Sequence, residues 1–304
     1  MLKFGFAHID ELMRLHYGAV ESYVKSLPPK EQDKLFGSIV QLNGFEAFGS
    51  VRPVADYSWL RQFILADIGT LRSWVKTQPD QLKFPQFKEL YSSGFANGKD
   101  KYVDTAGTYN AYTLIDRMDI HVCPYCDDEY LDIVEADGKV RRTSEFDHFF
   151  PEGDKKYPAL AMCFFNLVLS GQACNRLKLQ NEMDASPYQD DIENDTFLYP
   201  DIEIGENMEG KKPEDCKVLL HAKNGMVSNE KVLGLTARYA NRYQEAYHLL
   251  KLKQQFSDEK IAELVKMGLY DSADHLKSSL FGPPYEEGKF QQLHQKMKKD
   301  LVGY

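Results

Sequence analysis

Residues 145–178 read EFDHFFPEGDKKYPALAMCFFNLVLSGQACNRLK, and this stretch decides how the middle of the chain folds. Near its start lies the pair Asp147-His148, at the end of a predicted strand. Neighbouring residues on a strand point to opposite faces, so this carboxylate and imidazole address a common site only where the strand bends or ends. Pro151 follows closely and is consistent with such an ending.

The same stretch continues with a single amide among apolar side chains. Asn166 lies between Phe165 and Leu167, and a buried amide must find hydrogen-bond partners. We expect a structural amide that holds the loop carrying the Asp-His pair. A turn or a helix cap at this position is the plainer alternative.

The stretch ends with Cys174-Asn-Arg-Leu-Lys178, which is typical of the start of a helix. Asn175 offers a neutral oxygen ligand for a hard cation, and Lys178, one turn further on, offers a positive charge for a phosphate. Cys174 could serve as a zinc ligand. An ordinary capped helix with exposed basic residues explains the same residues without any ligand.

Upstream lies Cys123-Pro-Tyr-Cys126, a knuckle that places two thiolates on one side of a tight turn. This spacing suits tetrahedral zinc. Two buried small apolar residues are the alternative. A redox pair is disfavoured because the motif does not lie between the strand and helix of a βαβ unit.

A β-hairpin is predicted between the knuckle and Asp147. Residues 130–136 and 139–146 read as two strands, and Asp137-Gly138 between them is a typical two-residue turn. The flanks read as mostly helical instead, because their apolar residues recur at helical spacing. Helices are predicted over 1–30, 31–42, 59–75, 87–91, 109–118, 228–255 and 290–301, with Ser257 beginning another and a small hairpin over 218–227.

These patterns divide the chain into three regions. We predict a helical N-terminal region over 1–106, a central module over 107–200 and a mostly helical C-terminal region over 201–304. The boundaries rest on a stretch rich in Gly, Ser, Asn and Lys at 92–107 and on an acidic, Pro- and Gly-rich stretch at 181–215.

Composition excludes several classes of protein. The chain has 304 residues, 43% hydrophobic and 27% charged, and is long enough to bury a sizeable core. No stretch approaches the roughly 18 to 20 apolar residues that cross a bilayer, and the N-terminus lacks a signal-peptide pattern. Five cysteines are too few for a disulfide scaffold. We therefore expect a cytoplasmic protein with no membrane partner.

The net charge of −9 lies entirely in residues 120–200, which hold seven basic and 16 acidic residues. A protein that binds nucleic acid without a partner protein usually has a basic surface. We interpret the acidic segment as one that concentrates divalent cations. Other regions of the chain, or a partner, would then bind the nucleic acid. A solvated acidic surface is the alternative.

Taken in this order, the motifs resemble the HNH endonuclease superfamily, the ββα-metal fold. The match is formed by His148, Asn166 and Asn175, with Asp147 before the histidine. The chain is most similar to a branch of bacterial anti-phage nucleases, such as the Septu type, which reads CPYC, DHF-P, YP-LA, F-NL and CN--K. The resemblance covers about residues 109–190. It implies an α+β fold in which a small ββα-metal HNH module is embedded between mostly helical N- and C-terminal regions.

The resemblance also implies a role for each matching residue. Asp147 and Asn175 would ligate one Mg²⁺ or Mn²⁺. His148 would act as the general base that takes a proton from the attacking water. Asn166 would position the loop, and Lys178 would steady the phosphate. These roles suit phosphodiester hydrolysis, which needs a cation against developing charge and a base that titrates near neutral pH.

One position departs from the branch, which normally has a second C-x-x-C motif and so a cysteine at position 171. This chain has Gly171 there. Three thiolates remain, those of Cys123, Cys126 and Cys174. A four-thiolate Zn²⁺ site therefore cannot form in the usual way. His121, Cys163 or a water could complete it; alternatively zinc is absent and packing holds the knuckle, which we favour.

The resemblance implies a metal-dependent endonuclease that hydrolyses phosphodiester bonds, with DNA favoured as substrate. It further implies the effector of a bacterial anti-phage defence system, with an ATPase partner and in some systems a retron-type RNA or DNA. Two alternatives stay open. One is an RNA-cutting effector, for instance on tRNA, because HNH chemistry addresses the phosphate and not the base. The other is an adaptor with a decayed HNH core, for which Gly171 is the best argument.

Overall fold

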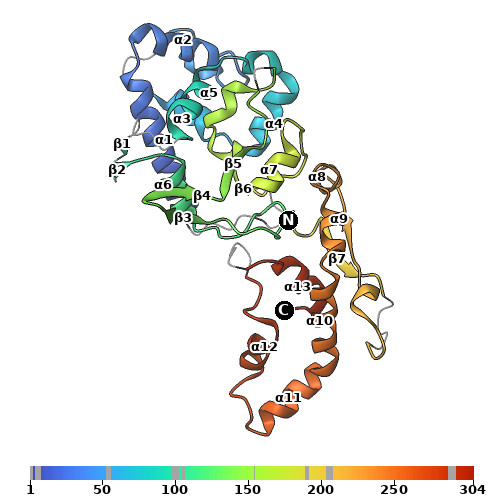
Figure 1. The fold of residues 1–304 in the computed structure, drawn as a ribbon. Coiled ribbons are helices and arrows are strands. Elements are labelled where there is room, and N and C mark those ends of the chain that lie inside the picture. The colour runs from blue at the N-terminus through green and yellow to red at the C-terminus, as the bar shows by residue number, and fades with distance from the viewer. Residues whose placement is uncertain are drawn as a thin grey trace.

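The computed structural model describes residues 3, 8–52, 56–96, 103–104, 107–153, 155–188, 192–202, 208–286 and 292–304. Figure 1 shows an upper body, built from the N-terminal helices and the central strands, and a lower lobe built from the C-terminal helices. The fold combines helices with short antiparallel strand pairs, as the α+β expectation requires. Within the described ranges, no helix combines the length and the apolar character needed to cross a membrane.

Helices dominate the chain up to residue 118. The apolar stripe predicted for the first helix is confirmed, since Leu12, Leu15 and Val20 are buried on one face. The helices are α1 (Ile9–Ser26), α2 (Pro29–Ile39), α3 (Ser58–Ile64), α4 (Ile68–Thr77), α5 (Gln86–Leu90) and α6 (Ala111–Met118), with short turns η1 (Glu46–Phe48), η2 (Pro79–Leu82) and η3 (Tyr91–Phe95).

The single helix predicted over 59–75 is wrong, because two helices occupy this stretch. α3 ends at Ile64, and the carboxylate of Asp67 accepts a hydrogen bond from the backbone N–H of Thr70 at 2.7 Å. A capping aspartate satisfies an N–H group that a helix start leaves unpaired, so it favours a new helix at this point. The break lets both α3 and α4 turn apolar residues into the same core.

The described strands form four antiparallel pairs. The pairs are β1 (Val103–Asp104) with β2 (Gly107–Thr108), β3 (Ile133–Ala136) with β4 (Lys139–Arg142), β5 (Ser144–His148) with β6 (Leu167–Gly171), and β7 (Thr196–Pro200) with β8 (Val218–Ala222).

The hairpin predicted around Asp137-Gly138 is confirmed as β3 and β4. Both turn residues have positive φ, 54° and 68°, as the turn that matches strand twist requires. The second strand is shorter than predicted. It stops at Arg142, and the chain from Ser144 pairs with β6 instead.

The C-terminal lobe is helical, but its predicted long helix over 228–255 is wrong. Gly234 adopts φ of 61°, the left-handed conformation that ends a helix, and so separates α8 from α9. The helix start predicted at Ser257 is confirmed, and its hydroxyl caps α11 by accepting from the backbone N–H of Lys260 at 3.3 Å. The elements are η6 (Pro213–Asp215), α8 (Met226–Leu233), α9 (Leu235–Ala240), α10 (Tyr243–Gln255), α11 (Asp258–Lys266), α12 (Ala273–Phe281) and α13 (Gln295–Val302).

Strand pairing and packing cross both of the predicted region boundaries. The hairpin predicted over 218–227 is wrong, since β8 pairs with β7 across the boundary expected at 200/201. The boundary at 106/107, partly outside the described residues, does not separate packed units, because α5 lies against η4 (Pro158–Met162). Buried residues from Leu12 to Val302 form one connected core.

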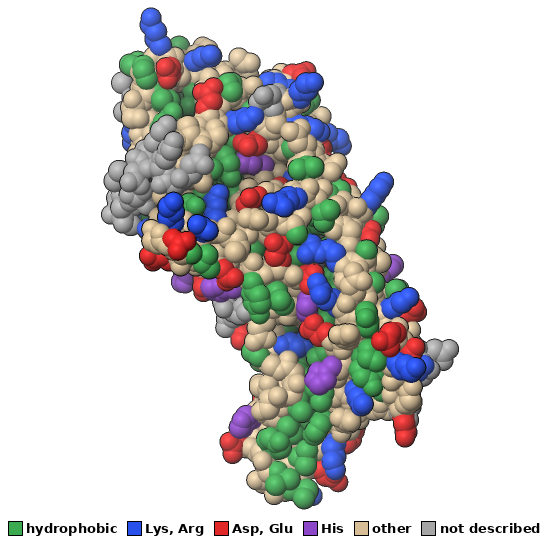
Figure 2. Space-filling model, viewed as in Figure 1, with side chains coloured by type: hydrophobic (Ala, Val, Ile, Leu, Met, Phe, Trp, Pro, Cys, Tyr) green, Lys and Arg blue, Asp and Glu red, His purple; other side chains and the backbone are tan. Residues whose placement is uncertain are grey.

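The surface carries charges of both signs. Figure 2 shows basic and acidic side chains interspersed over the visible face, with hydrophobic side chains gathered at the lower end of the lobe. Met267, Leu269 and Tyr270, which follow α11, are exposed. The visible face therefore presents no broad basic surface.

Candidate functional site

The candidate site is built on a strand–strand–helix unit. β5 and β6 pair so that His148, the last residue of β5, lies opposite Leu167, the first residue of β6. The connection between them carries η4 and η5 (Phe164–Asn166). Gly171 closes β6, and α7 (Gln172–Lys178) begins at the next residue. Since α7 packs against both strands, the unit brings the end of β5 against a helix.

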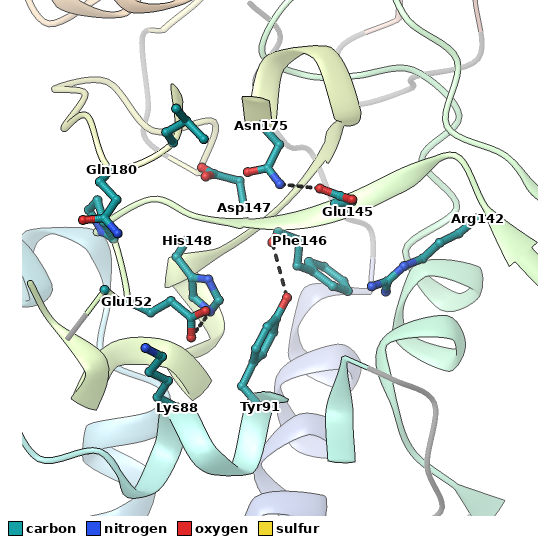
Figure 3. Close-up of a pocket in the computed structure, with 13 residues that line it drawn as sticks. Lys88, Tyr91, Arg142, Glu145, Phe146, Asp147, His148, Glu152, Asn175 and Gln180 are labelled. Carbon is teal, nitrogen blue, oxygen red and sulfur yellow. Dashed lines mark hydrogen bonds and ion pairs between the residues drawn. The ribbon is translucent and has the colours of Figure 1, made fainter. Parts of the chain in front are cut away.

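A cavity of about 400 Å³ lies beside the end of β5 (Figure 3). Its walls come from α5 and η3, from β4 and β5, from the segment after β5, and from α7 and the residues that follow it. The lining residues are Lys88, Tyr91, Arg142, Glu145, Phe146, Asp147, His148, Pro151, Glu152, Gly153, Asn175, Leu179 and Gln180.

Asp147 is held in the cavity wall by two donors. Only 2% of its surface is exposed. The Tyr125 hydroxyl donates to Oδ2 at 2.6 Å, and the Lys178 ammonium donates to Oδ1 at 3.0 Å. Burial and the nearby carboxylate raise the pKa of Tyr125, so the phenol stays a donor. Each carboxylate oxygen has a further lone pair, so the held carboxylate can still ligate a cation.

Lys178 is fully buried and also donates to the backbone oxygen of His148 at 2.6 Å. It is not part of the cavity wall, which differs from the phosphate contact expected from the sequence. The reason is helical geometry, because Lys178 and Cys174 are four residues apart and share the buried face of α7. A buried ammonium needs a counter-charge, which Asp147 supplies.

His148 is fixed as a neutral imidazole. Its Nε2 lies 3.0 Å from the backbone oxygen of Ala161. A carbonyl oxygen only accepts, so Nε2 carries the proton and Nδ1 keeps its lone pair. Burial lowers the pKa of His148 to about 3, opposed by the Ala161 bond and assisted by the Lys178 ammonium. The Glu152 carboxylate lies 3.8 Å from Nε2 (Figure 3).

Asn175 and Glu145 add oxygen atoms to the cavity wall. The Asn175 carboxamide donates to Oε2 of Glu145 at 2.5 Å (Figure 3). Glu145 is a residue that the sequence analysis missed. Its signal is its spacing, two residues before Asp147 on one strand, which places both side chains on the same face. Two carboxylates and a carboxamide form a hard donor set that suits Mg²⁺ or Mn²⁺.

Asn166 lies behind the site and is fully buried. Its oxygen accepts from the backbone N–H of Phe150 at 2.7 Å, and its nitrogen donates to the backbone oxygens of Phe150 and Leu160 at 3.1 and 3.0 Å. The amide thus ties the segment that follows His148 to η4. This is the structural contact with the loop that the sequence analysis expects.

Positive charge reaches the cavity from Lys88 on α5 and Arg142 on β4. The Arg142 guanidinium lies over the Tyr112 ring, 5.1 Å from its centre, and donates to the backbone oxygen of Ala96 at 3.2 Å. The sequence analysis singled out neither cation. For Arg142 the available signal is a pair of arginines at the end of a hairpin strand in an otherwise acidic segment.

The loop that fixes His148 is braced from α1. His16 lies with Nε2 2.8 Å from the backbone oxygen of Met162 and with Nδ1 2.8 Å from the Tyr109 hydroxyl. Met162 directly follows Ala161, the acceptor for His148. Burial lowers the pKa of His16 to about 4, against the opposing hydrogen bond to Met162. The N-terminal region therefore supports the site through a neutral buried histidine.

The cysteines form a second candidate site. Sulfur atoms of Cys123, Cys126 and Cys174 all lie within 4.8 Å of one another, and all three residues are buried. Soft thiolates at this separation suit Zn²⁺. The Arg238 guanidinium donates to the Cys174 sulfur at 3.1 Å. Burial raises the pKa of the Cys123 thiol.

The two side chains expected to complete this cluster lie elsewhere. His121 is exposed and pairs with Asp119 at 3.0 Å. Cys163 is buried, and its thiol donates to the backbone oxygen of Phe63 at 3.5 Å. The cluster therefore draws on neither of them.

Compared with known proteins, the chain matches no family model, no curated protein and no solved structure.

Proposed function

We propose that this chain is a metal-dependent endonuclease of the HNH type, which hydrolyses phosphodiester bonds in nucleic acid, with DNA the favoured substrate. One observation carries the proposal. At the end of β5, a neutral histidine lies in one cavity wall with two carboxylates and a carboxamide. An unprotonated histidine can accept a proton, and hard donors can hold the cation that phosphodiester hydrolysis uses. Burial lowers the pKa of His148 to about 3, below the near-neutral value expected from the sequence.

In this proposal His148 is the general base. Its Nδ1 accepts a proton from a water in the cavity while Nε2–H stays bonded to Ala161. The water oxygen bonds to phosphorus, the bond from phosphorus to the leaving oxygen breaks, and the leaving oxygen takes a proton from solvent. Glu152, 3.8 Å from Nε2, stabilises the positive charge that the ring gains. By analogy with the superfamily, the products carry a 5′-phosphate and a 3′-hydroxyl.

Asp147, Asn175 and Glu145 would hold the cation. When bound, Mg²⁺ or Mn²⁺ offsets the charge that develops on the phosphate and on the leaving oxygen. We assign Lys178 to positioning Asp147, because its ammonium is buried against that carboxylate. Contacts to the phosphate then fall to Lys88 and Arg142, the cations that line the cavity.

A cleavage assay tests the proposal. Purified protein is incubated with plasmid DNA or total tRNA in Mg²⁺, Mn²⁺ or EDTA. We expect cutting by wild type with either metal, and loss of cutting in EDTA and in His148→Ala. His275→Ala is the matched control, since this histidine is exposed on α12, and it should cut like wild type. Cutting of tRNA but not plasmid would overturn the DNA preference alone.

The proposal includes a bacterial anti-phage role with an ATPase partner. It is supported by the net charge of −9 and by the mixed charges on the visible face (Figure 2), which offer nucleic acid no broad basic surface there. If wild type alone cuts neither substrate, the assay is repeated with the products of neighbouring genes. Cutting that appears only with them supports a required partner. A folded chain that stays inactive with them supports the decayed adaptor instead.

A further inference from the structure

The starting point is the space beside Gly171. This residue precedes Cys174 by three positions, the same spacing that separates Cys123 from Cys126. A β-carbon at position 171 would stand 2.1 Å from Oε2 of Glu129, far too close for contact. The carboxylate of Glu129 therefore occupies the place that a side chain at 171 would take.

Glu129 belongs to the knuckle itself. Its backbone oxygen accepts from the backbone N–H of Cys123 at 2.9 Å. Its Oε1 lies 3.4 Å from the backbone N–H of Ala173, in the first turn of α7. Its Oε2 is buried and has no hydrogen-bond partner among the described residues. A buried carboxylate oxygen is costly without a donor or a cation.

We propose that Cys123, Cys126, Cys174 and Glu129 form a Zn²⁺ site in which the carboxylate replaces the missing fourth thiolate. Carboxylate oxygen is an accepted zinc ligand. The three sulfur atoms already form a group, and the backbone of Glu129 is hydrogen-bonded to that of Cys123. Oε2 lies where the β-carbon of a cysteine at 171 would stand, so the carboxylate occupies the place of the missing ligand.

The surrounding charges fit this assignment. Three thiolates and one carboxylate outweigh Zn²⁺ by two negative charges. Arg238 donates to the Cys174 sulfur and also lies 3.5 Å from the Asp128 carboxylate. A cation at this distance tunes a metal site from outside and orients its ligand. Without zinc, the same guanidinium would contact a neutral thiol at Cys174 and keep only the Asp128 carboxylate as its counter-charge.

Metal content and cobalt spectroscopy test the site independently of any cleavage activity. Reduced full-length protein is purified, and its zinc is measured by mass spectrometry together with its affinity in a chelator competition. Glu129→Gln keeps the shape and an oxygen for Ala173 but loses the charge. Glu135→Gln, an exposed change on β3, is the matched control. Circular dichroism confirms that each variant is folded.

We expect about one zinc per chain in wild type and in Glu135→Gln. Glu129→Gln should bind zinc at least about tenfold more weakly, since even groups that only orient a ligand are worth 10–100-fold. The double variant Glu129→Ala with Gly171→Cys should recover tight binding. With Co²⁺ in place of zinc, its thiolate charge-transfer band should rise from the intensity of three thiolates to that of four.

Two results would overturn the proposal. Folded, reduced wild type that neither retains nor takes up zinc would mean that packing and Arg238 alone hold the cluster. Equal zinc affinity in wild type and Glu129→Gln would mean that the carboxylate only caps α7 through Ala173.

Discussion

Cys174 and Asn175 are neighbours in α7, yet they face two different sites. Cys174 joins a closed cluster of soft sulfur atoms, whereas Asn175 faces an open cavity walled by hard oxygen atoms. Adjacent residues of one helix thus face the site proposed to hold zinc and the site proposed to admit a substrate. The comparison teaches that one short helix can contribute to two different sites when one face carries a soft sulfur donor and another carries a hard oxygen donor.

The two sites also differ in how their polar groups are satisfied. In the cavity, both Asp147 oxygens and the His148 Nε2 have hydrogen-bond partners. At the cluster, Oε2 of Glu129 has none among the residues that the structure describes. Protein contacts therefore fix Asp147 and His148, whereas the proposed zinc ligand Glu129 keeps an oxygen without a hydrogen-bond partner.

The largest loss of stability is expected from removing the buried charge of Lys178, which holds Asp147 in the cavity wall. Lys178→Met leaves Asp147 buried without its cation, and breaking such a pair costs about 3–5 kcal/mol. Urea unfolding should show this loss. Arg176→Met, an exposed change on the same helix, should stay within about 0.5 kcal/mol of wild type. A Lys178→Met protein as stable as wild type would show that the pair does not anchor the cavity.

The brace at His16 should make stability depend on pH. The folded state takes up this proton only near pH 4, whereas an unfolded histidine does so near pH 6.5. Between these values the unfolded state binds more protons, so stability falls as pH falls. The shift amounts to about 3 kcal/mol in total.

Unfolding of wild type and His16→Gln at pH 4 to 7 isolates this contribution. Glutamine can donate to Met162 and accept from Tyr109 but does not titrate in this range. The difference between the two proteins should shrink as pH falls from 6.5. Parallel profiles would contradict a neutral buried imidazole at this position.

Variants of the adjacent residues Cys174 and Asn175 on α7 test most directly whether the two sites act independently. Asn175→Ala should lower cleavage by at least about 100-fold, because it removes a group expected to ligate the cation, while zinc content stays unchanged. Cys174→Ala should lower zinc content and stability but leave cleavage per folded molecule close to wild type. If both variants lose the same property, the two faces of α7 do not act independently.

The smallest change in stability is expected for Arg238, which belongs neither to the cavity wall nor to the proposed zinc ligands. Arg238→Gln removes a hydrogen bond from a partly exposed cation to Cys174, and we expect a loss of about 1–2 kcal/mol. Thermal unfolding measures it. Cleavage should not change, since Arg238 does not line the cavity. A fall in cleavage equal to that of Asn175→Ala would link the cluster to the cavity.

Local rules account for the features that the sequence analysis placed correctly. The Asp137-Gly138 turn and the Ser257 cap depend on a residue's own conformational preference and on neighbours within three positions. The strand expected over 139–146 was placed only in part, since β4 ends at Arg142 and β5 (Ser144–His148) pairs with β6 instead. β6 was not predicted, because its apolar run, Leu167 to Leu169, is too short to show a period.

The sequence by itself determined which chemical groups are present and how they are spaced: the Asp147-His148 pair, the Cys123-Cys126 knuckle, and Cys174 beside Asn175. Only the tertiary structure decided what those groups touch. It buried Lys178 against Asp147, brought Glu145 to Asn175, and placed Glu129 where position 171 has no side chain. Spacing along an element fixes which face a residue takes, whereas its partners come from segments far away in sequence, and their packing decides which side chains fill the remaining space.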